Sequence, residues 1–259
     1  MLTGIDHVVL AVRDPLAAGD EVERSVGLAA TGGGRHESLG THNRLVWLGD
    51  SFLELIGVDD RELASRSWIG APVLRALDRD GGFVAVALAS DGLGADLDLL
   101  RGRGSILRGP LPGRRIAPDG SVVRWSLALP PSIGPQDPIF LIEHEPGPEW
   151  DAEALHARAV QVHPFGGTAR LAAVQLAVPS VRLSLGRLAR DVGLAFRPSL
   201  TGGGARDASV GDHLLRLVAA RPGTPGVIVT IRAAGRGRGA GATTVSADLF
   251  GCRFLVISS

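Results

Sequence analysis

Two ionisable side chains interrupt two apolar segments that have the composition of buried strands. Glu54 breaks the run Phe52–Ile56, and His7 breaks the first apolar run of the chain. A buried carboxylate needs a partner, and His7 is the candidate. A histidine beside a carboxylate can move protons or bind a transition metal. The same pair can instead be a hydrogen-bonded structural feature that fixes strand register.

A glycine-rich segment that precedes Glu54 adds polar groups with binding or catalytic chemistry. It carries Arg35, His36, His42 and Asn43. Loops held by a rigid sheet often carry binding groups, so we interpret Arg35, His36 and Asn43 as substrate-binding residues and His42 as a proton-transfer residue. The alternative is a solvated hairpin whose polar groups are all satisfied.

A second group of candidates lies between residues 114 and 145. Arg115 and Trp125, with Arg114 and Arg124 beside them, could bind a substrate carboxylate or phosphate, because guanidinium groups suit planar anions. Arginines on the outer face of a strand are the commoner case. Glu143 ends another apolar run and is followed by His144 and Glu145, and the two-residue period of a strand lets only one neighbour face a given side.

The composition favours a protein that binds small molecules. The 259 residues contain 27 Lys and Arg against 27 Asp and Glu, so no basic field predicts a nucleic-acid or membrane-surface partner. One cysteine, Cys252, excludes an internal disulfide and fits a reducing compartment, so we expect a cytoplasmic monomer or homodimer. Gly32–Gly34 lacks the lysine of a phosphate-binding loop, and Gly235–Gly241 lacks the aromatic residues of an RNA-binding tract.

The first quarter of the chain predicts one strand, one helix and three further strands. Residues 4–13 are rich in β-branched residues, and Asp14-Pro15 then opens a helix of about 12 residues that Gly27 closes. Three strands follow, around residues 29–31, 44–48 and 52–58. This βαβββ order recurs with strands at 82–90, 114–115, 122–129 and 139–144 and a helix at 91–101.

The second half repeats the first in letters as well as in pattern. Val192–Ala195 repeats Val26–Ala29, and Gly211–Leu217 matches Gly49–Leu55. Such self-similarity indicates duplicated supersecondary units. We therefore predict an α+β protein with a first half at 1–145, a linker with a short helix at 146–168, and a second half at 169–259. The second half would hold one full unit and one degenerate unit that lacks its helix.

Tandem βαβββ units with these motifs resemble the vicinal oxygen chelate superfamily, and most closely its glyoxalase-like domain family. The motifs that carry the resemblance are Ile5-Asp6-His7-Val8-Val9, Gly33-Gly34-Arg35-His36, Gly40-Thr41-His42-Asn43, Phe52-Leu53-Glu54-Leu55-Ile56, Arg114-Arg115, Arg124-Trp125 and Phe140-Leu141-Ile142-Glu143. The resemblance covers roughly residues 4–178. It implies mixed-sheet, half-open barrels formed by paired units.

The resemblance also implies a divalent metal (Zn, Mn, Fe, Co or Ni) in the cleft. His7, Glu54 and Glu143 match three ligand positions, and Glu54 would also be catalytic. The fourth ligand is missing, because the strand at 82–90 offers no donor. In the second half the position of Glu54 holds Arg216, a cation that would repel a metal.

We therefore expect a glyoxalase-like protein that acts on a small oxygen-bearing metabolite, as a metal-dependent lyase, isomerase or dioxygenase. The alternative is a non-catalytic protein that binds or sequesters a small molecule. Multiple turnovers would separate the two.

Overall fold

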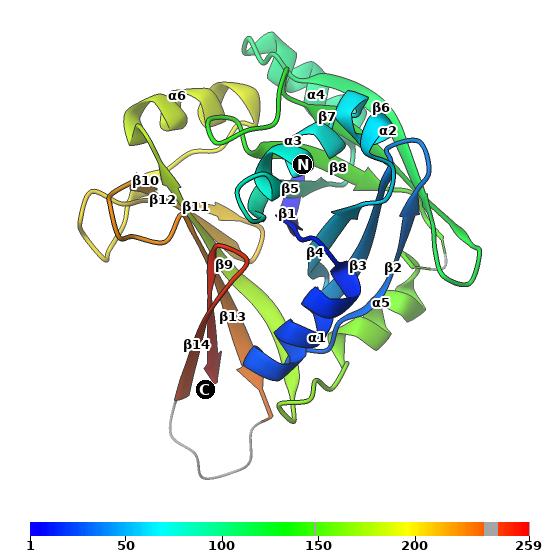
Figure 1. Cartoon of the computed structure of the whole chain (residues 1–259). Coiled ribbons are helices and arrows are strands. Elements are labelled where there is room, and N and C mark those ends of the chain that lie inside the picture. The colour runs from blue at the N-terminus through cyan, green and yellow to red at the C-terminus, as the bar shows by residue number, and fades with distance from the viewer. Residues whose placement is uncertain (148, 236–242, 259) are drawn as a thin grey trace.

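The first half of the chain forms a closed eight-stranded barrel. Figure 1 shows the whole chain as a computed structural model, which describes residues 1–147, 149–235 and 243–258. The strand order around the barrel is β1-β4-β3-β2-β6-β7-β8-β5. The strands are β1 (Leu2–Ala11), β2 (Thr31–His36), β3 (Thr41–Leu48), β4 (Ser51–Val58), β5 (Gly82–Ser90), β6 (Arg108–Ile116), β7 (Val122–Leu129) and β8 (Ile139–His144).

Two βαβββ units build this barrel side by side. β1 is antiparallel to β5, its counterpart in the second unit, and parallel to β4. On the opposite side β2 meets β6 through the pair Arg35 and Ile116, which closes the barrel. The predicted α+β class and its βαβββ units are therefore confirmed.

The helix of the first unit begins and ends as its sequence signals predict. α1 (Pro15–Val26) has Asp14 as its N-cap, and Gly27 ends it in the left-handed region at φ 70°. α4 (Leu93–Gly102) takes the same place in the second unit.

Two short helices between the units, α2 (Arg61–Arg66) and α3 (Gly70–Leu77), had no predicted counterpart. Pro72 lies in the first turn of α3, where proline is tolerated. Ile69, Val73 and Ala76 join the apolar cluster inside the barrel, so α3 covers part of the barrel interior.

The second half forms an open seven-stranded sheet in the order β10-β11-β12-β9-β13-β15-β14. Its elements are β9 (Thr168–Val178), α6 (Val181–Asp191), β10 (Arg197–Pro198), β11 (Arg206–Val210), β12 (His213–Ala219), β13 (Val227–Ala234), β14 (Thr243–Leu249) and β15 (Cys252–Ser258). α5 (Ala152–Ala159) occupies the segment between the two sheets. Residues 236–241 of the glycine-rich run Gly235–Gly241 lie outside the described residues.

One apolar cluster joins the outer face of the barrel to the second sheet. Val8 and Leu10 on β1 belong to it together with Val174 on β9 and Leu215 on β12. Strand alternation sends Val9 and Ala11 to the separate cluster inside the barrel. β1 is thus buried on both faces. Among the described residues, no helix is long and apolar enough to cross a membrane.

A bulge in β1 breaks this alternation at the residues of greatest chemical interest. Ile5 pairs with Leu88 and His7 pairs with Ala87, so Asp6 is an extra residue opposite β5. A bulge re-aims side chains, and here it allows the neighbours Asp6 and His7 both to contact groups of the barrel interior.

His213 of the second sheet holds the backbone beside this bulge. Its Nδ1 accepts a hydrogen bond from Ile5 N at 2.9 Å, and Ser51 Oγ donates to Ile5 O at 2.7 Å. Because Nδ1 accepts, the neutral ring carries its proton on Nε2, which lies 3.3 Å from Ser51 Oγ. Gly4 leaves the necessary room, since a Cβ there would lie 2.9 Å from His213 Nδ1.

We expect the protein to lose stability on acidification because it buries neutral histidines. Burial lowers the pKa of His213, which Asp50 and Asp212 partly counteract, and burial also lowers the pKa of His163, whose Nδ1 accepts from Ala29 N. The unfolded chain then binds more protons than the native state, so the free energy of unfolding should fall as pH drops below about 6.5.

Urea unfolding between pH 5 and 8 measures this dependence. His213→Asn retains an acceptor for Ile5 N without a titrating group, so its stability should vary less with pH than that of the wild type. An unchanged slope in this variant would contradict the assignment.

Candidate functional site

A cavity inside the barrel gathers most of the predicted site residues. Its volume is about 50 Å³. The lining residues come from seven of the eight barrel strands and from the segments around Trp68 and Trp150: His7, His36, Leu39, Asn43, Leu45, Trp47, Phe52, Glu54, Ile56, Trp68, Ile69, Arg115, Val123, Trp125, Leu127, Phe140, Ile142, His144 and Trp150.

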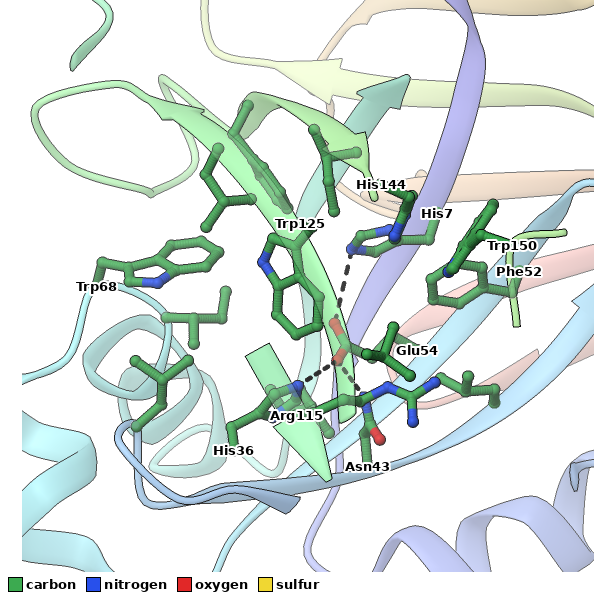
Figure 2. Close-up of a pocket in the computed structure, with 18 of the residues that line it drawn as sticks. His7, His36, Asn43, Phe52, Glu54, Trp68, Arg115, Trp125, His144 and Trp150 are labelled. Atoms are coloured by element: carbon green, nitrogen blue, oxygen red, sulfur yellow. Dashed lines mark hydrogen bonds and ion pairs between the residues drawn. The ribbon is translucent and has the colours of Figure 1, made fainter. Parts of the chain in front are cut away.

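Glu54 is the polar centre of this cavity (Figure 2). Its Oε2 lies 3.7 Å from His7 Nε2, and its Oε1 lies 3.9 Å from His36 Nε2. Asn43 Nδ2 donates to Oε1 at 2.5 Å. These side chains come from β4, β1, β2 and β3, so four neighbouring strands position one carboxyl group.

Asp6 supports this centre from behind His7. Its carboxylate contacts His7 Nδ1 at 2.5 Å and His144 Nε2 at 3.1 Å. Burial by itself would raise the pKa of Asp6, but the charge and hydrogen bonds of His144, and then those of His7, outweigh it and hold the pKa well below its usual range. A carboxylate can only accept, so both imidazoles direct an N–H at Asp6. That leaves His7 Nε2 directed at Glu54.

His36 is a buried ring held from its other side. Its Nδ1 lies 3.0 Å from Thr41 Oγ1. Burial lowers the pKa of His36, an effect that Glu54 partly opposes and Arg115 reinforces. The neutral ring is thus favoured, and a neutral imidazole can either donate or accept a proton from a bound ligand.

Aromatic rings make up much of the cavity wall. His7 stacks on Phe52 with 4.5 Å between ring centroids, and His144 stacks on Trp150 at 3.6 Å. Trp125 packs directly against the backbone of β6 at Gly113, where a Cβ would come within 2.0 Å of the indole nitrogen. Trp68 packs edge-on against Phe140, and Figure 2 shows Trp150 beside Phe52.

Arg115 brings a buried positive charge to the same cavity. Only 5% of the residue is exposed, and its guanidinium donates to Gly33 O at 2.6 Å and to the Glu149 carboxylate. Arg158 on α5 holds the Glu149 carbonyl and stacks over Trp47 at 3.9 Å. The segment after β8 is therefore tied to the cavity by two arginines.

Two cavity residues keep buried polar atoms without a hydrogen-bond partner within the described part of the chain. These atoms are Asn43 Oδ1 and His144 Nδ1. An unsatisfied buried group costs about 1–3 kcal/mol, so each such atom calls for an explanation. A ligand oxygen or N–H group in the cavity would supply the missing partners.

Six predicted site residues line the cavity, and three do not. His7, His36, Asn43, Glu54, Arg115 and Trp125 line it. Arg35, which precedes His36 on β2, is exposed and forms an ion pair with Asp59 at 2.7 Å. His42 lies on the outer face of β3, where its ring would contact a Cβ on Gly57. The period-two alternation of each strand separates Arg35 from His36 and His42 from Asn43.

Glu143 does not face the cavity as predicted, and its neighbour His144 does. Glu143 Oε2 accepts a hydrogen bond from Leu93 N at the start of α4, away from the cavity. His144 lines the cavity in its place. A strand end offers one residue to each face, and the sequence did not indicate which of the two faces inward.

Several site residues had no predicted role. Asp6 belongs to the motif Ile5-Asp6-His7-Val8-Val9, but regular strand alternation would place its side chain on the opposite face from His7. The bulge in β1 is what brings both side chains to the site. Trp150 and Glu149 were assigned to the linker. The sequence feature that could have indicated their role is Trp150 itself, because an exposed linker seldom carries a tryptophan.

The donor set does not fit the superfamily's four-ligand metal site. His7 and Glu54 are suitable ligands, and the His7–Asp6 contact is the support that metal-bound histidines usually have. However, Ala87 occupies the third position, opposite His7, and Glu143 is turned away at the fourth. Among the described residues no group of three or more His, Cys, Asp or Glu is arranged to hold a metal ion.

A barrel of paired βαβββ units with its polar site inside defines a vicinal-oxygen-chelate-type protein. The model of the glyoxalase-like domain family matches residues 5–192, and the chain belongs to that family. No curated protein matches the sequence.

Solved structures are similar to all or part of this chain. A hypothetical protein from Staphylococcus aureus is similar over 99% of both chains, with a TM-score of 0.78 and 16% identity. Methylmalonyl-CoA epimerase from Streptomyces coelicolor matches 55% of this chain and 98% of its own, with a TM-score of 0.43 and 19% identity. The epimerase from Mycobacterium tuberculosis matches 57% and 91%, with a TM-score of 0.41 and 21% identity.

Proposed function

We propose that this protein is an enzyme that moves a proton on a small oxygen-bearing metabolite, as an isomerase or lyase, with Glu54 as the base. The observation that carries the proposal is the Glu54 carboxyl group at the cavity wall, between the imidazoles of His7 and His36. General bases are carboxylates or imidazoles within reach of the substrate proton, in a site that excludes water.

Asn43 and Asp6 prepare the residues for this step. Asn43 holds Glu54 Oε1, so Oε2 is the oxygen directed toward His7 and the substrate. Asp6 fixes His7 through Nδ1 and His144 through Nε2. His144 Nδ1 then remains to hydrogen-bond a ligand, and an imidazolium there would donate to a developing oxyanion.

The proposed reaction needs no external oxidant or reductant. Glu54 takes the proton from a carbon next to a carbonyl group, and the bonding electrons move onto the carbonyl oxygen. His144, as an imidazolium, donates a hydrogen bond from Nδ1 to that enolate oxygen. The proton returns to carbon from Glu54 or from an imidazole, which gives an isomer, or the enolate expels a leaving group.

Non-catalytic binding is the second candidate, because the unpartnered Asn43 Oδ1 and His144 Nδ1 would serve a tightly bound ligand equally well. Exchange of carbon-bound hydrogen for deuterium in D₂O, followed by ¹H NMR with pyruvate and phenylpyruvate as probes, tests for catalysis. Exchange of many equivalents above the uncatalysed rate supports an enzyme. One bound equivalent by calorimetry without exchange would instead identify a binding protein.

We expect protein purified without added metal to contain less than stoichiometric Zn, Mn, Fe, Co and Ni. Two of the four ligand positions lack a donor in the cavity, so we assign no step to a metal. Elemental analysis of the wild type, His7→Ala and Glu54→Ala measures this. Stoichiometric metal in the wild type that both variants lose would show that the cavity is a metal centre.

A further inference from the structure

The two apolar cores of this protein differ in their aromatic content. The buried part of the cluster between the barrel and the second sheet contains Phe254 as its single aromatic residue among the described residues. All four tryptophans of the chain, Trp47, Trp68, Trp125 and Trp150, line the cavity instead. An aliphatic core suffices to stabilise the fold, so the concentration of tryptophan around one cavity indicates a preference of its ligand.

The cavity wall already stacks planar groups in parallel. The His144 and Trp150 rings are 13° from parallel, and the His7 and Phe52 rings are 18° from parallel. The cavity that these rings line is small, at about 50 Å³. Aromatic faces pair favourably with other flat rings, so a planar ligand suits this space better than a bulky saturated one.

Arg115 indicates the charge of the ligand. Its guanidinium is buried at the cavity wall and pairs with the carboxylate of Glu149, which belongs to the segment after β8. The side chain of Glu149 is 23% exposed and does not line the cavity itself, so this carboxylate reaches Arg115 from outside the cavity wall. The protein thus places a carboxylate of its own on Arg115, and a ligand carboxylate could replace it with the same geometry.

We propose that the cavity binds a planar aromatic organic acid, whose ring lies among the tryptophans and whose carboxylate displaces Glu149 from Arg115. This inference rests on the proposed function in one respect, which is that the reacting carbon of the ligand would face Glu54. Ligand binding itself requires no turnover.

Three probes of similar size separate the two parts of this proposal. Phenylacetate carries both the ring and the charge, cyclohexylacetate lacks the planar ring, and phenylacetamide lacks the charge. Calorimetry, with tryptophan fluorescence as a second readout, should give phenylacetate an affinity about tenfold higher than either of the other two. Because all four tryptophans line the cavity, binding there should change the emission spectrum.

Glu149→Gln tests the displacement step without disturbing the cavity wall. Removal of the internal competitor should tighten phenylacetate binding about tenfold and leave phenylacetamide binding unchanged. Equal affinities for phenylacetate and cyclohexylacetate would overturn the aromatic preference. Three results would overturn the assignment to an acid. These are equal affinities for phenylacetate and phenylacetamide, weaker binding of phenylacetate by Glu149→Gln than by the wild type, and no binding of any probe.

The binding experiment and the turnover experiment test different claims, so either claim can be wrong while the other holds. Phenylacetate binding with no deuterium exchange in phenylpyruvate would retain the ligand class and remove the proposed function. Exchange in pyruvate that equals exchange in phenylpyruvate, with no phenylacetate binding, would retain the function and remove the ligand class.

Discussion

Glu54→Gln is expected to lower the enzyme-dependent rate of deuterium exchange by about 10³-fold, within the range that a general base contributes. Glutamine keeps the size of the side chain and an oxygen for the Asn43 amide, but it cannot take a proton from carbon. Binding of a ligand that does not react should change much less. ¹H NMR of exchange and calorimetry of phenylacetate binding measure the two effects separately.

Glu143→Gln is the matched control, because it makes the same chemical change on the outer side of the barrel. Glu143 contacts Leu93 N and does not line the cavity. Its variant should exchange deuterium at the wild-type rate. If the Glu143 variant lost exchange and the Glu54 variant kept it, the base would be wrongly assigned.

Asp6→Asn is expected to lower the free energy of unfolding by about 3 kcal/mol at pH 7, as removal of one partner from a buried charged network does. The change replaces one carboxylate oxygen by an amide NH2 group, so one of the two imidazole N–H groups must then face an amide N–H. Urea unfolding gives the stability. ¹⁵N NMR titration of the histidines reports whether the protonation of His7 and His144 changes.

Asp98→Asn provides a surface comparison, since its pair with Arg101 is exposed and such pairs contribute about 0–1 kcal/mol. Because the folded-state pKa of Asp6 is depressed, its stabilisation is present above the unfolded pKa of about 4 and is lost as pH falls below that value. The wild type and Asp6→Asn should therefore converge in stability at strongly acid pH. A constant difference at every pH would mean that Asp6 acts through packing.

The second half has kept the pattern of the first but not its chemistry. Arg216, at the position that matches Glu54, forms a two-pronged ion pair with Asp207 on the neighbouring strand β11. His213 connects this sheet to the barrel at Ile5, next to the bulge. The second sheet therefore contributes to the site by holding β1.

Local patterns determined much of this protein directly from sequence. β-Branched runs set the strands at 122–129 and 139–144, Asp14-Pro15 and Gly27 set the ends of α1, and the repeated letters indicated the tandem units. The interrupting charges at His7 and Glu54 identified two strands that meet in the site, because an ionisable group in a buried strand needs a nearby partner. Such signals depend on neighbours in the chain, and so they can be found without a structure.

Tertiary structure decided which side of each strand faces the cavity and what reaches it from a distance. The sequence contains both His42 and Asn43, and both Glu143 and His144, but strand register selects Asn43 and His144. The bulge that adds Asp6 exists only in the pairing of β1 with β5. Arg115 meets Glu149 because the segment after β8 returns to the barrel, and the energy of that contact depends on residues far apart in the chain. The two-residue period of a strand shows that neighbouring side chains face opposite sides of the sheet, but it does not show which of them faces the cavity. The set of residues in the site is therefore determined by the tertiary structure.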